Sequence, residues 1–366
     1  QTYVEEYGSF DVALKAIQAG ETDILESEWG VMVTDANGYA KSKELPFGTY
    51  YVSETKVPDP DSLLKVDDFT VTVTEDSREP QQWKILNDEL YESQLQIIKK
   101  DAETGNVVQL PGATFKIYDK NAGDYVGFWV WNPLPTYMTE FTTDESGMVY
   151  LPETLKAGSY RLEEIKAPDG YLLDAEPIDF EIKTSNVTQV GDDGETPVFT
   201  LTMADTSAKG QIKVSKEGEV LVGIETDENG NIQFQYEMQK LAGATINLYA
   251  AEDIYSADNS KMLIYAKDAL VETITTTENG GESALLPLGN YYAKEITAPN
   301  GMVISDARID IALDYEGQET EIVIRNADFT NERQKVELNV SKVDADTGEP
   351  IQGAEFTIYA KEDIAL

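Results

Sequence analysis

Lysine, glutamate and either asparagine or aspartate recur in this sequence at positions where their side chains could react with one another. Each ends a short segment in which apolar and polar residues alternate, as in Leu95, Ile97 and Lys99. Because the side chains of a β-strand point alternately to its two faces, the alternation predicts that the reactive group shares the buried face. The lysines with this placement are Lys99, Lys216 and Lys342, and the glutamates are Glu54, Glu164 and Glu295.

The third reactive residue of each set is an Asn or Asp that closes an alternating segment. Asn87 and Asp205 end two such segments. In residues 322–331 the choice stays open between two asparagines. Asn326 continues the alternation of the isoleucines before it, whereas Asn331 precedes the next strand lysine by about the same interval as Asn87 and Asp205 do. We favour Asn331 and keep Asn326 as the alternative.

These three residue types on one buried face suggest that an amide bond forms between side chains. A lysine amine has an ordinary pKa of about 10.4, and burial among apolar groups lowers the pKa because it disfavours the ammonium ion. The neutral amine can then attack the side-chain carbonyl of Asn or Asp, with the buried glutamic acid transferring protons. The competing interpretation is ordinary: charged groups at strand edges are usually solvated or form weak surface ion pairs.

Three kinds of segment repeat along the chain, and each predicts one part of a common folding unit. The lysine segments are residues 95–118, 338–359, and 212–216 with 241–249. The glutamate segments are residues 48–58, 158–171 and 289–301. The Asn or Asp segments are residues 83–87, 198–205 and 322–331. Short strands separated by Gly, Asn, Asp and Pro turns predict an all-β protein of tandem β-sandwiches.

The order of the segments predicts four domains, at residues 1–92, 93–207, 208–333 and 334–366. The third is expected to carry an insertion after its strand lysine, and the first and last to be incomplete. Weak helical periodicity suggests short helices at residues 11–19 and 250–255.

The composition excludes several classes of function. The chain has 366 residues, of which 68 are acidic and 28 basic, with no cysteine and no histidine. A formal net charge of −40 opposes binding to nucleic acid or to anionic lipid, which both need clustered Lys and Arg. Without Cys or His there are no disulfides, thiolate or imidazole metal sites, or Ser-His-Asp catalysis. We therefore expect no metal, no cofactor and no enzyme activity beyond a single intramolecular reaction. No run of about 18 apolar residues predicts a membrane span.

Taken together, the patterns LxIxKxDxxTG, LxGAxFxIY and YxLxExxAPxGY, followed by a closing Asn or Asp, resemble the CnaB-type domain, also called SpaA-like or prealbumin-like. This resemblance covers nearly the whole chain. It implies Ig-like or prealbumin-like sandwiches in a rod, carrying Lys–Asn or Lys–Asp isopeptide bonds assisted by Glu. It also implies an extracellular location at the cell wall or cell surface of a Gram-positive bacterium, as in adhesins and pilins. No pilin-type lysine motif and no sortase sorting signal is present.

The resemblance assigns roles to the reactive residues. It implies complete sets in the second and third domains and partial sets in the other two. The complete sets are Lys99, Glu164 and Asp205, and Lys216, Glu295 and Asn331; the partial sets are Glu54 with Asn87, and Lys342 alone. Two departures lie in the third domain: the insertion before Leu241, and Met302 where the pattern has Tyr.

The aromatic segment at residues 125–137 could serve a second function. Trp129 and Trp131 could form a platform for a host glycan or an extracellular matrix protein. We favour a strand pair that packs into the core, because large aromatic side chains usually bury their area. The sequence therefore predicts a structural stalk of a surface adhesin, and a ligand-binding adhesin module is the alternative.

Overall fold

The computed structural model describes residues 31–45, 47–74, 84–131, 133–228 and 230–362. The chain divides into two compact units, Gln1–Glu89 and Leu90–Leu366. Among the described residues the only helical element is the 3-10 turn η1 (Thr184–Asn186), so the all-β prediction is confirmed. The helix suggested at residues 250–255 is wrong: strand β17 (Thr245–Ala250) ends there, residues 251–252 form a bend, and strand β18 (Ile254–Tyr255) follows. The helix suggested at 11–19 lies outside the described residues.

The first unit contains one described strand pair. Strand β1 (Gly48–Val52) runs antiparallel to β2 (Phe69–Val73), with Tyr50 opposite Val71. The predicted glutamate strand thus forms, and it ends two residues before Glu54.

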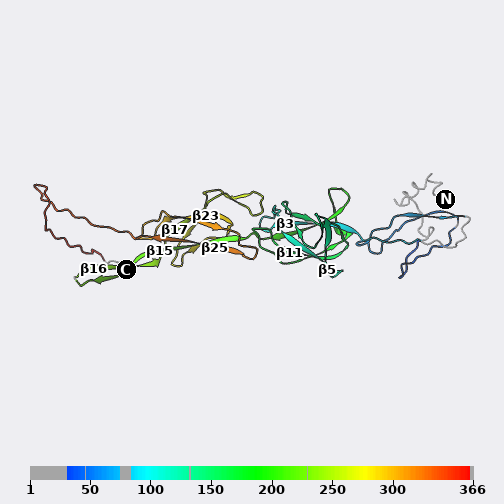
Figure 1. Ribbon diagram of the computed structural model, residues 1–366, viewed down its shortest axis with the longest axis horizontal. Helices are drawn as coiled ribbons and strands as arrows, with labels where there is room; N and C mark the ends of the chain where they lie inside the picture. Colours follow the sequence, from blue (N-terminus) through cyan, green and yellow to red (C-terminus); the bar gives the residue numbers. More distant parts are fainter. Residues whose placement is uncertain (1–30, 46, 75–83, 132, 229, 363–366) are drawn as a thin grey trace. The chain divides into compact units, whose positions relative to one another are not determined.

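The first part of the second unit, up to Asp205, is a sandwich of two sheets (Figure 1). One sheet has the order β10-β3-β14-β13, with β9 also paired to β3. Its strands are β3 (Glu92–Asp101), β9 (Met148–Tyr150), β10 (Leu155–Lys156), β13 (Gln189–Val190) and β14 (Pro197–Asp205). The other has the order β12-β11-β4-β5, with β8 also paired to β4. Its strands are β4 (Thr114–Asp119), β5 (Asp124–Tyr125), β8 (Phe141–Thr142), β11 (Gly158–Lys166) and β12 (Ile178–Ile182). The remaining strands, β6 (Phe128–Trp131) and β7 (Pro135–Met138), form a separate hairpin.

Alternating residues of the two facing sheets form the core of this sandwich. Leu95 and Ile97 of β3 face Phe115 of β4 and Leu162 of β11, and all four are fully buried. Burying one such side chain stabilises the fold by roughly 1.5–3 kcal/mol. The core therefore explains why the strands alternate, and it places the next inward position of β3, Lys99, at the end of the apolar stripe.

The part of the second unit from Lys209 to Asn331 repeats this plan. One sheet is built on β15 (Lys209–Thr226), which pairs with β16 (Ile232–Lys240), β21 (Gly281–Glu282), β22 (Leu286–Pro287) and β25 (Ile322–Asn331). The other has the order β20-β17-β23-β24, with β20 (Leu270–Thr275), β23 (Gly289–Thr297) and β24 (Arg308–Leu313). Strand β18 pairs with β19 (Leu263–Tyr265) in a hairpin. The predicted insertion is the ribbon made by the second half of β15 and β16 (Figure 1).

Residues 332–362 contain no strand. The predicted strand at 338–342 is wrong in this structure: Leu338 and Val340 are 69% and 52% exposed, and Lys342 is also exposed. No strand of the described chain pairs with this segment, and an extended segment without such a partner leaves its apolar side chains in solvent. Alternation alone predicts which residues share a face, and a neighbouring sheet is still needed to cover that face.

Among the described residues, no helix is both long enough and apolar enough to cross a lipid bilayer.

Candidate functional site

Three predicted residues meet inside the sandwich formed by the first part of the second unit, up to Asp205. Lys99 lies on β3 and Asp205 ends β14 in one sheet, while Glu164 lies on β11 in the facing sheet. The Nζ atom of Lys99 is 2.5 Å from Oε2 of Glu164 and 2.5 Å from Oδ1 of Asp205, and all three side chains are fully buried. The ring of Phe115 lies 5.9 Å from the same nitrogen. The amine therefore touches both acids in an apolar pocket closed to solvent.

The strand register explains why Asp205 lies diagonally across from Lys99 on the neighbouring strand. Strands β3 and β14 are parallel, with Met203 opposite Lys99 and Asp205 opposite Asp101. Met203 is the inward residue directly opposite Lys99. Because inward positions alternate, the next inward position on β14 is Asp205, two residues further along. The N–H of Ala102 donates a hydrogen bond of 2.8 Å to the Asp205 carbonyl, which fixes the end of β14.

Burial controls the protonation of this centre. It raises the pKa of Glu164 to about 8, although the positive charge of Lys99 acts in the opposite direction. Burial also raises the pKa of Asp205, again against the effect of Lys99. Oε1 of Glu164 and both carboxyl oxygens of Asp205 lack a hydrogen-bond partner of good geometry among the described residues. Buried polar atoms are nearly always hydrogen-bonded. Three buried oxygens without a well-formed hydrogen bond in one pocket therefore need an explanation, although Lys99 Nζ lies 2.5 Å from one of them.

A second centre with the same layout lies in the part of the second unit from Lys209 to Asn331. Lys216 of β15, Glu295 of β23 and Asn331 at the end of β25 are all buried. Lys216 Nζ donates to Asn331 Oδ1 and lies 3.1 Å from Glu295 Oε1. Asn331 Nδ2 donates to the same Glu295 oxygen at 3.0 Å, and the Phe329 ring lies 5.5 Å from the lysine nitrogen. Burial lowers the pKa of Lys216, against the effect of Glu295. The parallel register is also the same, with Gly218 opposite Asn331.

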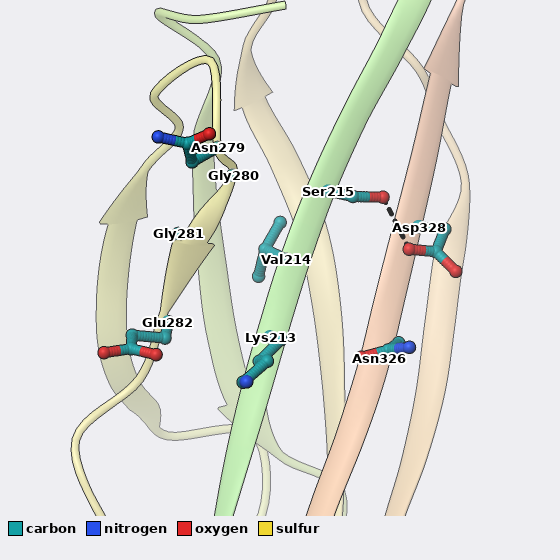
Figure 2. Close-up of a pocket in the computed structure, with 9 residues that line it drawn as sticks. All are labelled: Lys213, Val214, Ser215, Asn279, Gly280, Gly281, Glu282, Asn326 and Asp328. Carbon is teal, nitrogen blue, oxygen red and sulfur yellow. Dashed lines mark hydrogen bonds between the residues drawn. The ribbon is translucent and has the colours of Figure 1, made fainter. Parts of the chain in front are cut away.

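The structure distinguishes between the two candidate asparagines. Asn326 is exposed and pairs in register with Lys213, on the outer face of β15 and β25 (Figure 2). Figure 2 shows it in a surface hollow beside the contact between Ser215 and Asp328. The inward face of β25 carries Val323, Ala327, Phe329 and Asn331. The alternation through Ile322, Ile324 and Asn326 belongs to the outer face, so Asn331 is the asparagine that meets the lysine.

The partial sets do not assemble. Glu54 is half-buried and accepts the N–H of Val66 at 3.0 Å, much as Glu295 accepts the N–H of Ser305 at 2.7 Å. Asn87 is exposed in a segment without regular structure, and Lys342 is exposed as described above. The structure thus brings together the two complete sets and neither partial one.

The aromatic segment does not pack as we favoured. Strands β6 and β7 pair with each other in a hairpin that belongs to neither sheet of the sandwich. Phe128 is buried in the core, but Trp129 and Trp131 are 64% and 78% exposed. The ring of Trp129 lies beside that of Tyr137 within the hairpin, with centroids 5.3 Å apart. The core-packing interpretation is therefore wrong for both tryptophans, because they lie exposed on a hairpin that pairs with neither sheet of the sandwich.

One buried residue next to the first centre was not predicted to matter. Tyr171 is fully buried and its hydroxyl donates to Oδ2 of Asp101 at 2.7 Å, two residues after Lys99. Tyr171 is the last residue of the APDGY pattern, and this position in the repeat is the sequence feature that could have indicated its burial. In the part of the chain from Lys209 to Asn331, Met302 occupies the position that corresponds to Tyr171, and it is also buried.

Comparison with known proteins supports the repeat pattern. A family model described as the SpaA prealbumin-like fold domain matches residues 12–87, 93–196 and 235–328. A comparison with curated proteins gave no match.

Several solved structures are similar to the chain. The Bacillus anthracis TIE protein is 23% identical, with a TM-score of 0.47, over 82% of this chain and 45% of that one. A streptococcal ancillary pilin is 17% identical, with a TM-score of 0.25, over 89% and 88% of the two chains. A C-terminal fragment of the pilus adhesin SpaC from Lactobacillus rhamnosus GG is 16% identical, with a TM-score of 0.33, over 67% and 100%. The chain thus spans less than half of the first of these proteins.

Proposed function

Since the chain belongs to the family of SpaA prealbumin-like fold domains, we propose that it is a stalk segment of a cell-wall-associated adhesin on a Gram-positive bacterium. Its proposed domains are residues 1–92, 93–207, 208–333 and 334–366. In this proposal the second and third domains are stabilised by self-formed isopeptide bonds, Lys99–Asp205 and Lys216–Asn331.

The observation that carries the proposal is the pair of buried centres. Each holds a lysine amine against a carboxyl or carboxamide group and a glutamate, with no solvent between them. In the Asp205 centre three buried oxygens lack a hydrogen-bond partner of good geometry among the described residues. Amide formation would remove one Asp205 oxygen as water and would remove the charges of both partners, which accounts for this otherwise costly arrangement.

In the second domain the reaction joins Nζ of Lys99 to Cγ of Asp205. The neutral amine attacks the carbonyl carbon of the protonated carboxyl group, and a C–N bond forms. Glu164, which stays protonated at neutral pH because of its raised pKa, donates a hydrogen bond to the carbonyl oxygen and passes protons from nitrogen to the departing hydroxyl. The C–O bond breaks and one water leaves. Burial and fixed geometry supply the proximity that this step requires.

In the third domain the same attack by Lys216 on Asn331 expels ammonia. The Asn331 amide nitrogen already contacts Glu295, which is the group placed to protonate the leaving nitrogen. Lys216 reaches the amide on its oxygen side, and burial favours its neutral, nucleophilic form. The two centres thus differ in leaving group and share the nucleophile and the acid.

An extracellular stalk agrees with the remaining properties of the chain. Proteins outside the cell often rely on disulfides, and this chain has no cysteine, so covalent stabilisation has to come from another bond. Its net charge of −40 favours solubility and discourages self-association.

Intact-mass measurement tests the proposal. The purified chain should weigh less than its sequence by one water and one ammonia, and digestion should yield a peptide branched at Lys99 and Asp205 and another branched at Lys216 and Asn331. Masses equal to the sequence mass would refute both bonds, and a branch at Asn326 would refute the assigned acceptor.

The exposed tryptophans favour a second candidate function, ligand binding by the β6–β7 hairpin. Trp129 and Trp131 offer aromatic faces to solvent, which suits a host glycan or an extracellular matrix protein. A glycan and matrix-protein binding screen should then find a ligand whose binding is lost in Trp129→Ala/Trp131→Ala. The control Phe234→Ala removes an exposed aromatic ring from the β15–β16 ribbon. Equal binding by the double variant would refute this candidate.

A further inference from the structure

The second and third domains meet through a buried aspartate. Both lie in the compact unit Leu90–Leu366. Asp258, in the loop between β18 and β19, is fully buried although the loop is at the surface of its own domain. Its Oδ2 atom accepts hydrogen bonds from Thr104 Oγ1 at 3.1 Å and Asn106 Nδ2 at 2.9 Å, both in the turn that follows β3. Its Oδ1 atom accepts the N–H of Ser260 at 2.9 Å.

Main-chain groups reinforce the same contact. The N–H of Gln109 donates to the Asp258 carbonyl at 2.9 Å, and Asn259 Nδ2 donates to the Gln109 carbonyl at 3.0 Å. Burial opposes ionisation of Asp258, yet the hydrogen bonds from Ser260 and Asn106 hold its pKa well below the ordinary value. A buried carboxylate that accepts hydrogen bonds from both domains forms a specific binding site, in contrast to an incidental surface contact.

A second set of contacts joins the two domains elsewhere. The hydroxyl of Tyr315 donates to the carbonyl of Tyr171 at 2.8 Å. Gln318 accepts the N–H of Ala167 on its side chain at 3.0 Å, and the N–H of Leu173 on its carbonyl at 3.3 Å. These contacts act together with the covalent connection after Asp205, beside which Lys209 Nζ of the third domain lies 2.6 Å from Glu103 Oε2 of the second. The domains are therefore attached through the Asp258 loop, through Tyr315 and Gln318, and along the linker.

The turn that receives Asp258 is specific for it. Asp101 Oδ1 caps this turn by accepting the N–H groups of Glu103 and Thr104, each at 2.8 Å. The counterpart turn in the last repeat has the same cap, since Asp344 Oδ1 accepts the N–H groups of Asp346 and Thr347 at 3.0 and 2.9 Å. The position of Asn106 is taken there by Glu349. A glutamate would repel an incoming aspartate, where an asparagine donates a hydrogen bond to it.

From these contacts we infer that the turn 101–106 is a docking site for the Asp258 loop, and that it locks the second and third domains into one mutual orientation. Two domains joined by a short linker ordinarily move relative to each other unless an interface holds them. The cross-links proposed above act inside each domain, so this inference does not depend on them. Its functional consequence is that the stiff element of the stalk is the domain pair.

Distance measurements in solution test this inference. The chain has no cysteine, so Glu153→Cys and Glu278→Cys place one spin label on an exposed site of each domain. Pulsed electron paramagnetic resonance on the full chain should give one narrow distance distribution. Asp258→Ala should at least double its width, and so should Asn106→Leu, which alters the other domain. The matched control Asp306→Ala changes an exposed aspartate of the third domain and should leave the width unchanged.

Two results would overturn the inference: a broad distribution in the parent chain, or a narrow one that neither docking variant widens. Circular dichroism of each variant confirms that the sandwiches remain folded, and having one variant in each domain guards against local unfolding of either. The intact mass of the same samples reports the cross-links separately, so failure of the docking site and failure of the proposed bonds give different results.

Discussion

Replacing Lys99 with methionine should remove the proposed cross-link while preserving the shape of the core. Methionine is unbranched and apolar, and it can fill the space of the lysine stem between β3 and β11. Glu164 and Asp205 would remain, both buried and without an amine beside them. Because burial already raises the pKa of both acids, we expect them to become neutral and the domain to fold.

The magnitude follows from the chain that the bond encloses. A cross-link from Lys99 to Asp205 closes a loop of about 100 residues, which in the chain-entropy model stabilises the fold by roughly 4–5 kcal/mol. For a domain of about this size, 1 kcal/mol corresponds to roughly 4 °C in the unfolding midpoint. Lys99→Met should therefore lower the midpoint of the second domain by about 15–20 °C.

Differential scanning calorimetry of the full chain, paired with intact mass, measures this effect. The matched control is Lys100→Met, which removes the neighbouring, partly exposed lysine by the same substitution. The control should keep the mass deficit and the parent midpoint. If Lys99→Met keeps the water loss, or if both variants unfold at the same temperature, the reasoning from the buried centre is refuted.

Three further outcomes are expected. Glu164 has a pKa raised to about 8, so its neutral acid persists at neutral pH and is lost as the pH rises through that value; water loss by unreacted chain refolded from denaturant should slow on the alkaline side, as followed by mass against time. Asp205→Asn should change the leaving group, so the peptide branched at this position should show loss of ammonia in place of water. Gly147→Ala should lower the unfolding free energy by about 2 kcal/mol more than Gly105→Ala in denaturant titration. Both glycines have φ near +74°, but an added Cβ at Gly147 would lie 2.0 Å from the Val108 carbonyl oxygen, whereas at Gly105 it meets open space.

The sandwich fold and the positions of its lysines could be predicted from local patterns. In β3, Leu95 and Ile97 precede Lys99 on one set of alternate positions, while the other set is polar except for Ile98, so the pattern favoured one inward face. Strand β25 begins with apolar residues on both of its alternating sets of positions, Ile322 and Val323 among them. Alternation could not choose a face there, and the position of the acceptor had to come from spacing.

Other features depend on contacts that no local pattern encodes. Whether Trp129 is buried depends on whether its hairpin lies over a sheet, and the hairpin instead pairs only with itself. Asp258 and Asn106 are 152 residues apart in sequence, and each looks like an ordinary turn residue. The segment 338–342 has the alternation of β3 and still forms no strand, because a ladder requires a neighbour. Long-range pairing therefore decided the parts that the sequence left open.

The position of the proposed bond within the strands determines what a pulling force can do. Strand β3 leads into the second domain from its start at Glu92, and β14 leads out of it at Asp205. These two strands are adjacent and parallel, so a force on the chain ends would slide one along the other until the domain unravels. With Lys99 joined to Asp205, the force passes from β3 through the amide directly to the exit of the domain. The residues between them carry no tension, and only the few positions of β3 before Lys99 can still extend. Lys216 and Asn331 divide β15 and β25 in the same way, so an adhesin stalk built of such domains would resist extension through its covalent path even where the sandwich itself is only marginally stable.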